Sequence, residues 1–243
     1  MHYSRRLVIS GKYFELYAYE KGLKRDFTRT KKKICEHEQM QIDYQVEEKK
    51  VGTELSKRKD SIARTRTQIR RIINSNMDFT KFTTLTFKNH EKSVPVANKH
   101  FNKFIMRLNY KYGNFKYISV IEFQPCEAVH YHFLSNLPYI EKKELAEIWK
   151  NGYVKINKIK HVDNLGAYVC KYLQKDMTEK RLFNKKKFFC SKNIEKPIEI
   201  YDDREIENTL EYYNLSDAKP EFENKFSNEF IGNVEYKVFK LKL

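Results

Sequence analysis

The sequence predicts an α+β fold whose core has the element order β-α-β-β-α-β. Two kinds of hydrophobic periodicity alternate along this part of the chain, a period of two that is typical of strands and a three- to four-residue spacing that is typical of helices. We expect strands at 82–87, 115–123, 129–134 and 153–159, and helices at 96–108 and 141–149. This order is that of the ferredoxin-like or RRM-like arrangement, an antiparallel sheet with both crossover helices on one face. The opposite face is then free to carry a site.

Each element has its own local signal. The stretch 82–87 reads Phe-Thr-Thr-Leu-Thr-Phe and alternates strictly, whereas 96–108 repeats Ala and Phe at helical spacing. A tight connection at 124–127 joins the second and third strands, and Asn151-Gly152 forms the turn before the fourth. Asp163 or Asn164 is a suitable N-cap for a final helix that continues to about residue 176.

The flanking regions are less regular. Residues 6–20 predict a hairpin with its turn at Gly11-Lys12, and residues 234–241 alternate as a strand that could pair with this hairpin. Residues 21–60 form a lysine-rich, partly helical connector, followed by a helix at 61–74. We therefore expect an N-terminal hairpin and basic helical connector (1–78), a core (79–200) and a C-terminal extension that packs on the core (201–243).

Charge is the strongest compositional signal. The 243 residues have a formal net charge of +16 and a pI of about 9.5, which favours a polyanionic partner, nucleic acid first and an anionic membrane surface second. No apolar run approaches the roughly 18 residues that span a bilayer, and the first residues lack a signal-peptide pattern. Four cysteines without CxxC spacing are typical of reduced thiols, so we expect a cytoplasmic protein.

A metal site is predicted by a His-x-His motif. His130 and His132 are two residues apart in an expected strand, so both imidazoles project from the same face of the sheet. If the preceding connection centres on Cys126, Glu122 lies directly opposite His130 and shares that face, with Gln124 as a reserve ligand. Two nitrogens and one oxygen suit Mn²⁺, Co²⁺ or Zn²⁺, and Mg²⁺ when substrate oxygens complete the shell.

Three protein ligands leave coordination positions open, which is typical of a catalytic metal site. Taken alone, however, a His-x-His motif on a strand is more often incidental. The histidines at 90, 100 and 161 have no comparable partners, and we interpret them as surface or packing residues.

A nucleophile is predicted on the final helix, which contains Tyr-x-x-Lys twice. Residues three and four apart share a helix face, so four side chains form one cluster: Tyr168, Lys171, Tyr172 and Lys175. A neighbouring stripe of Leu165, Val169 and Leu173 can pack on the sheet, and Gly166 and Ala167 permit close approach. A tyrosine oxygen with a pKa near 10 attacks a phosphodiester only with help from a metal and a cation. An isolated pair of such tyrosines is more often core packing, but the order of the two motifs favours chemistry.

Two basic clusters are candidates for nucleic-acid contact. The helix at 61–74 places isoleucines on one stripe and four arginines largely off it: Arg64, Arg66, Arg70 and Arg71. The alternative is the solvated face of a packing helix. Further along, Arg181, Lys185, Lys186 and Lys187 stand beside two phenylalanines, a mixture that single-strand channels use. Here the alternative is a solvated turn over two core phenylalanines.

Together these motifs resemble those of the HUH endonucleases, specifically the replication initiators of rolling-circle plasmids and phages. The stretch 82–87 resembles the first family motif, and His130-Tyr131-His132 resembles the His-hydrophobic-His motif that holds the metal, with Glu122 placed like the additional ligand. Tyr168 with Lys171 resembles the Tyr-x-x-Lys motif that carries the nucleophile. The close likeness covers roughly residues 80–178.

The resemblance implies a nuclease that uses Mg²⁺ or Mn²⁺ and binds single-stranded or hairpin origin DNA. Tyr168 would attack the scissile phosphate, leaving a 5′-phosphotyrosine link and a 3′-OH that primes synthesis by a host polymerase. Lys171 and Lys175 would neutralise the phosphorane, and Tyr172 is similar to the second tyrosine of two-tyrosine initiators. Because no GxxxxGK[ST] phosphate loop is present, a host helicase would unwind the duplex.

Two rival interpretations remain at this point. A transposase or a conjugative relaxase could share the metal and the tyrosine, although relaxases usually place the tyrosine before the histidines. In a different class, the chain could be a non-enzymatic single-strand binder on an RRM-like sheet. That interpretation predicts aromatic residues on the exposed sheet face, where Glu122, His130 and His132 stand instead.

Overall fold

The computed structural model describes residues 2–24, 47–159, 165–166, 169, 188–228 and 231–241, with the main chain alone described at 47–60. The chain forms two compact units, one of residues 58–196 and one of residues 1–57 together with 197–243. The predicted parts, 1–78, 79–200 and 201–243, divide the chain at other places, because contacts assign most of the helix before residue 76 to the central unit. Both units are α+β with antiparallel sheets, as predicted.

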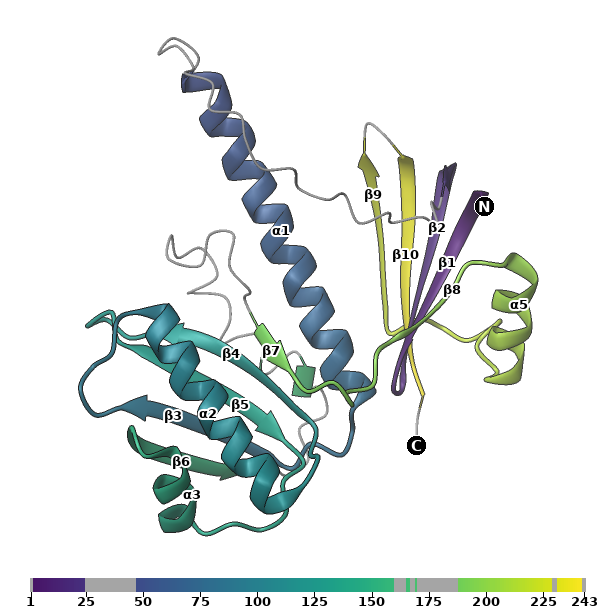
Figure 1. Cartoon of the computed structure of the whole chain (residues 1–243). Coiled ribbons are helices and arrows are strands. Elements are labelled where there is room, and N and C mark those ends of the chain that lie inside the picture. The colour runs from purple at the N-terminus through teal and green to yellow at the C-terminus, as the bar shows by residue number, and fades with distance from the viewer. Residues whose placement is uncertain are drawn as a thin grey trace, which may run out of the picture. The chain divides into compact units, whose positions relative to one another are not determined.

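The unit of residues 58–196 is built on a five-stranded sheet (Figure 1). Its strands are β3 (Lys81–Phe87), β4 (Tyr117–Phe123), β5 (Val129–Ser135), β6 (Gly152–Lys158) and β7 (Phe188–Cys190). They lie in the order β6-β3-β5-β4-β7, and every neighbouring pair is antiparallel. The first four strands confirm the predicted βαββαβ core, whereas β7 was not foreseen.

Helices α2 (Val94–Tyr112) and α3 (Lys142–Trp149) cover one face of this sheet (Figure 1). Helix α2 begins with Pro95 in its first turn and buries Phe101, Phe104 and Leu108, the stripe that the sequence predicts. These side chains pack against the sheet residues that point away from the histidines, among them Tyr131 and Phe133. The face opposite the predicted site is therefore the main core.

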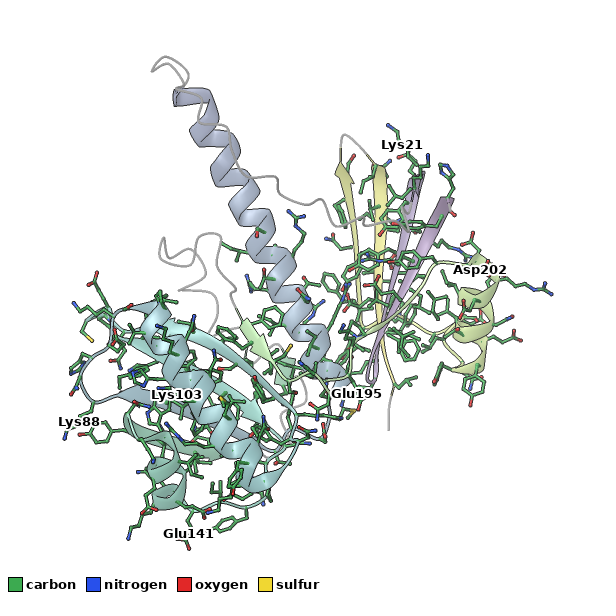
Figure 2. All side chains as sticks on the ribbon, viewed as in Figure 1. Lys21, Lys88, Lys103, Glu141, Glu195 and Asp202 are labelled. Atoms are coloured by element: carbon green, nitrogen blue, oxygen red, sulfur yellow. The ribbon has the colours of Figure 1, made fainter. Side chains whose placement is uncertain are left out.

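The other face of the sheet is only partly open, which corrects the expectation of a free face. The C-terminal half of α1 (Glu47–Ser75) packs Ile69, Ile72 and Ile73 against sheet residues of this face, including Val120 and Leu134. Asn76 after α1 exchanges hydrogen bonds with the main chain of Glu195, a residue labelled in Figure 2. The site is thus bordered by a helix on one side.

The second unit also contains a five-stranded antiparallel sheet, in the order β8-β1-β2-β10-β9. Its strands are β1 (His2–Ser10), β2 (Tyr13–Lys24), β8 (Ile198–Ile200), β9 (Phe222–Asn228) and β10 (Gly232–Lys240). The pairing of β10 with β2 confirms that the alternating end of the chain joins the N-terminal hairpin. Strands β8 and β9 were missed.

Helix α5 (Asp203–Tyr212), also missed, packs Ile206 and Leu210 against this second sheet. Asp202, labelled in Figure 2, caps the helix by accepting a hydrogen bond from the main-chain nitrogen of Glu205 at 2.9 Å. Arg5 of β1 forms ion pairs with Asp203 and Glu207. Within the part of the chain that the structure describes, no helix is long and apolar enough to cross a membrane.

Candidate functional site

The register of the β4–β5 hairpin brings the predicted ligands together. Glu122 pairs directly with His130, as expected for a connection centred on Cys126. The turn is closed by hydrogen bonds from Gln124 N to Ala128 O at 3.0 Å and from Glu127 N to Gln124 O at 2.7 Å. Because side chains of directly paired residues share a face, Glu122, His130 and His132 project from the same side of the sheet.

His132 is held on three sides. Its Nδ1 lies 3.2 Å from the Thr84 hydroxyl, and its ring stacks on Phe82 with centroids 5.3 Å apart. Its Nε2 is in direct contact with the Glu122 carboxylate. The His132 side chain is 7% exposed and that of Glu122 is 32% exposed, so the carboxylate forms the solvent-facing side of the pair. The imidazole consequently has one well-defined position.

These contacts bear on what the site can bind. If Nδ1 carries the ring proton and donates it to Thr84, the Nε2 lone pair faces a carboxylate oxygen. Two such acceptors approach one another favourably only with a cation or a proton between them. A metal-ligating histidine typically has this arrangement, with its other ring nitrogen fixed by a hydrogen bond.

His130 is buried, and its Nε2 has no hydrogen-bond partner among the described residues. Burial lowers the pKa of this imidazole below its ordinary value; the Glu122 charge opposes the shift, while His132 and His90 add to it. A buried polar atom without a partner is costly and calls for an explanation. A neutral imidazole with an unpaired nitrogen is the form that binds a metal ion.

The donor set of Glu122, His130 and His132 fits a divalent ion that accepts nitrogen and oxygen, such as Mn²⁺ or Mg²⁺ with further oxygen ligands. Among the described residues, no three His, Cys, Asp or Glu side chains are arranged as a formed metal site. The reason at this position is the direct contact between Glu122 and His132. An ion enters the set when these two side chains separate.

Further polar side chains stand at the turn beside the ligands. Cys126 Sγ lies 3.8 Å from His90 Nδ1 and 3.6 Å from the amide oxygen of Gln124. The reserve ligand Gln124 is therefore engaged with a cysteine in the turn. The sequence interpretation missed His90 as a neighbour of His130, because a loop residue has no pairing rule.

Thr84 and Phe82 were also missed as contacts of His132. Both lie in the 82–87 strand whose role in the resembled family was unassigned, and Thr84 pairs directly with His132 across β3 and β5. The alternation of the two strands could have identified Thr84 if the β3–β5 register had been derived.

The predicted nucleophile cluster, Tyr168, Lys171, Tyr172 and Lys175, lies outside the described residues. Three neighbours in the same predicted helix are described, namely Leu165, Gly166 and Val169, and all three are helical. Val169 is buried in the same cluster as Phe82 and Val120. The predicted packing of this stripe on the sheet is confirmed for Leu165 and Val169.

Gly166 permits a close approach, as predicted, but to helix α1. A Cβ added at Gly166 would lie 2.8 Å from the Arg70 carbonyl oxygen and 2.7 Å from Asn74 Oδ1. Neither distance leaves room for a side chain. The glycine therefore allows the predicted helix to pack directly on α1.

The candidate DNA-binding arginines of α1 differ in exposure. Arg64 is exposed, Arg66 and Arg70 are half-buried, and Arg71 is buried. All four take part in further contacts within the structure. Arg64 is therefore the most accessible of them.

The second basic cluster, Arg181 and Lys185–Lys187, lies outside the described residues. The two phenylalanines after it form strand β7, where Phe188 packs with one hydrophobic cluster and Phe189 with the other. This packing on both sides of the sheet favours the interpretation as core phenylalanines over that of an aromatic channel.

These features define an α+β protein with a histidine and carboxylate site on one face of an antiparallel sheet. Residues 80–177 match a family of replication-associated proteins of the ORF2 type. The match includes β3 to β6, all three candidate ligands and the segment with the paired tyrosines, and it confirms the predicted kinship with replication-associated proteins for this part of the chain. No curated protein and no solved structure matches the chain significantly.

Proposed function

We propose that this protein initiates replication by nicking and rejoining single-stranded DNA at an origin, through a covalent 5′-phosphotyrosine intermediate. The match to a replication-associated family supports the role in initiation. The observation that carries the chemistry is the convergence of Glu122, His130 and His132 on one sheet face, with a buried histidine nitrogen that lacks a partner among the described residues.

His130 Nε2, His132 Nε2 and the Glu122 carboxylate would hold the ion. A bound Mg²⁺ or Mn²⁺ would supply Lewis-acid polarisation of the scissile phosphate. Thr84 and Phe82 hold the His132 ring in place, so little reorganisation of this ligand is needed. The covered side of the site, formed by α1 and Val169, limits water on that side.

Tyr168 is the proposed nucleophile. Its oxygen forms a bond to the 5′-phosphate, the bond from phosphorus to the 3′-oxygen breaks, and that oxygen takes up a proton. The support from packing is that Val169, the next residue in the chain, is buried with Phe82 on the histidine face of the sheet. Lys171 and Lys175 would stabilise the negative charge that develops on the phosphate oxygens, and Tyr172 would resolve the joint after one round.

The test is a denaturing gel of the protein incubated with Mn²⁺ and single-stranded oligonucleotides tiled across the DNA that flanks its gene. We expect a covalent protein–DNA band that disappears with chelator, with Tyr168→Phe and with His130→Ala. His100→Ala is the matched control, because His100 lies on α2, which covers the opposite face, and its ring contacts Phe87. It should keep the band.

Two other outcomes change the proposal. If Tyr172→Phe alone removes the band, the two tyrosines exchange roles. If several oligonucleotides bind but none forms an adduct, the protein is a single-strand binding module, and the proposed chemistry is wrong.

A further inference from the structure

The face that carries the histidines continues beyond them to the edge of the sheet. Thr86 of β3 pairs with His130 on one side and with Tyr153 of β6 on the other. Glu122, His130, Thr86 and Tyr153 therefore form one row across four strands, all on the same face. In the next row, Lys155 of β6 pairs with Thr84, the residue that contacts His132.

Strand β6 is the edge strand of this sheet (Figure 1). Its alternation divides it into two sides. Val154 and Ile156 belong to the core under α2 and α3, so Tyr153, Lys155 and Asn157 must point to the histidine face. The side that α1 and Val169 cover lies at the other rows of the face, around Phe82 and Leu134.

These three edge residues are accessible. Tyr153 is 67% exposed, and Lys155 and Asn157 are exposed as well. None of the three side chains forms a hydrogen bond, ion pair or ring contact with any other part of the chain that the structure describes. Their polar and aromatic groups are thus available to a ligand that lies along the sheet.

A lysine on an edge strand has a simple structural explanation, since charged side chains prevent edge-to-edge pairing. A tyrosine exposed to this extent has no such role. An exposed aromatic ring next to a cation is the combination with which proteins bind single-stranded nucleic acid, the ring for a base and the cation for a phosphate. The formal net charge of +16 agrees with a polyanionic ligand.

We propose that the β6 side of the histidine face is a binding track for the single-stranded DNA segment beside the scissile phosphate. A base stacks on Tyr153 and a phosphate lies against Lys155, while Asn157 offers a hydrogen bond further along. Neighbouring strands are about 4.8 Å apart, so Tyr153 is two strands, or roughly 10 Å, from His130. This inference rests on the proposed function for the identity of the substrate, but it concerns binding and not the nicking step.

The first test is the binding of fluorescein-labelled oligothymidylate, measured by fluorescence anisotropy in the presence of chelator. Tyr153→Ala should weaken binding by on the order of tenfold, the usual effect of removing one stacking ring. Tyr153→Phe keeps the ring and should bind like the wild type. Tyr110→Ala is the matched control, since Tyr110 is 95% exposed but lies on α2, which covers the opposite face.

The second test uses salt dependence. Removal of one phosphate contact lowers the slope of log K against log salt by about 0.7 for a single strand. Lys155→Ala should show this reduction. Lys103→Ala removes the same charge from α2, where Figure 2 labels Lys103, and should leave the slope unchanged.

The outcomes separate this inference from the proposed function. If Tyr153→Ala binds oligothymidylate as tightly as the wild type, the track is wrong, even where the wild type forms the covalent adduct. If Tyr153→Ala weakens binding but no adduct ever forms, the track stands and the nicking proposal fails. Equal loss of affinity for a blunt duplex would also overturn the inference, because a duplex offers no unstacked base to the ring.

Discussion

At the level of single residues, the candidate site depends on how His132 is fixed. The ring has Thr84 at one nitrogen, Glu122 at the other and Phe82 against its flat side. Two of these contacts come from β3, the strand that pairs with β5 along its length. A role for the threonine-rich strand 82–87 follows: it orients a ligand.

The contact between Thr84 and His132 predicts that Thr84→Val weakens Mn²⁺ binding. Loss of such a supporting hydrogen bond typically costs 10- to 100-fold in metal affinity, because the ring loses its preferred orientation and tautomer. Isothermal titration calorimetry with Mn²⁺ alone measures the effect without DNA. Thr84→Ser keeps the hydroxyl and should restore most of the affinity; equal affinity of Thr84→Val and wild type would contradict the assigned role.

In the second unit, Tyr19 predicts a dependence of stability on alkaline pH. Burial raises the pKa of this phenol to about 12, the Arg6 charge opposing the shift. The folded chain therefore holds the phenol proton more tightly than the unfolded chain, whose pKa is near 10. The resulting stability is complete below pH 10 and is lost as the pH rises through about 12.

We expect the free energy of unfolding of wild type to fall between pH 9 and pH 12 by on the order of 1 kcal/mol more than that of Tyr19→Phe, with solvent screening limiting the effect. Urea unfolding at both pH values measures it, with Tyr110→Phe, an exposed tyrosine on α2, as the control. Parallel pH profiles for wild type and Tyr19→Phe would refute the assignment.

At the level of elements, the order and type of the core elements follow from local pattern. The hydrophobic stripe of α2 and the alternation of β3, β5 and β6 are strong, and the structure confirms them. Strands β7 and β8 have three residues each and were missed. A three-residue strand contains too few positions for a period to be visible, so pairing with a neighbour decides it.

The packing of the predicted nucleophile helix on α1 gives a prediction at this level. Gly166→Ala normally favours a helix, but here the added Cβ would meet the Arg70 carbonyl oxygen. We expect a loss of about 1–3 kcal/mol in the free energy of unfolding, the usual cost of overpacking. Denaturant unfolding measures it, and a stabilised Gly166→Ala would show that the two helices are not in close contact.

At the level of the whole molecule, the two units have separate hydrophobic cores, one around Trp149 and one around Phe14. The second unit joins both ends of the sequence, since β10 and β8 pair with the N-terminal hairpin. The hairpin of β1 and β2 is therefore only part of a sheet. An isolated two-stranded hairpin is marginally stable in water.

We predict that deletion of residues 197–243 unfolds the N-terminal hairpin but leaves the unit of residues 58–196 folded. Trp149 is the single tryptophan of the sequence and is fully buried in that unit, so its fluorescence reports on that core alone. The fluorescence transition in urea should keep its midpoint, while circular dichroism loses strand signal. A collapse of the Trp149 transition would show that the units depend on one another for stability.

The predicted metal ligands illustrate how far local pattern reaches. His130 and His132 share a face because strand side chains alternate, and Glu122 joins them because a short hairpin connection sets the register. The same rules could not foresee that Glu122 contacts His132 and not His130, since that depends on side-chain rotamers.

The amino-acid sequence was enough to predict the βαββαβ core, the face of the histidines and the kinship with replication-associated proteins, because periodicity and hairpin register are local properties. Tertiary structure alone decided the remaining features. Thr84 meets His132, Tyr153 joins the row of His130, and α1 covers part of the face, because each of these contacts joins segments that are distant in the chain. Such contacts depend on strand order and helix packing, which minimise exposed apolar surface over the whole fold and have no periodic signal of their own.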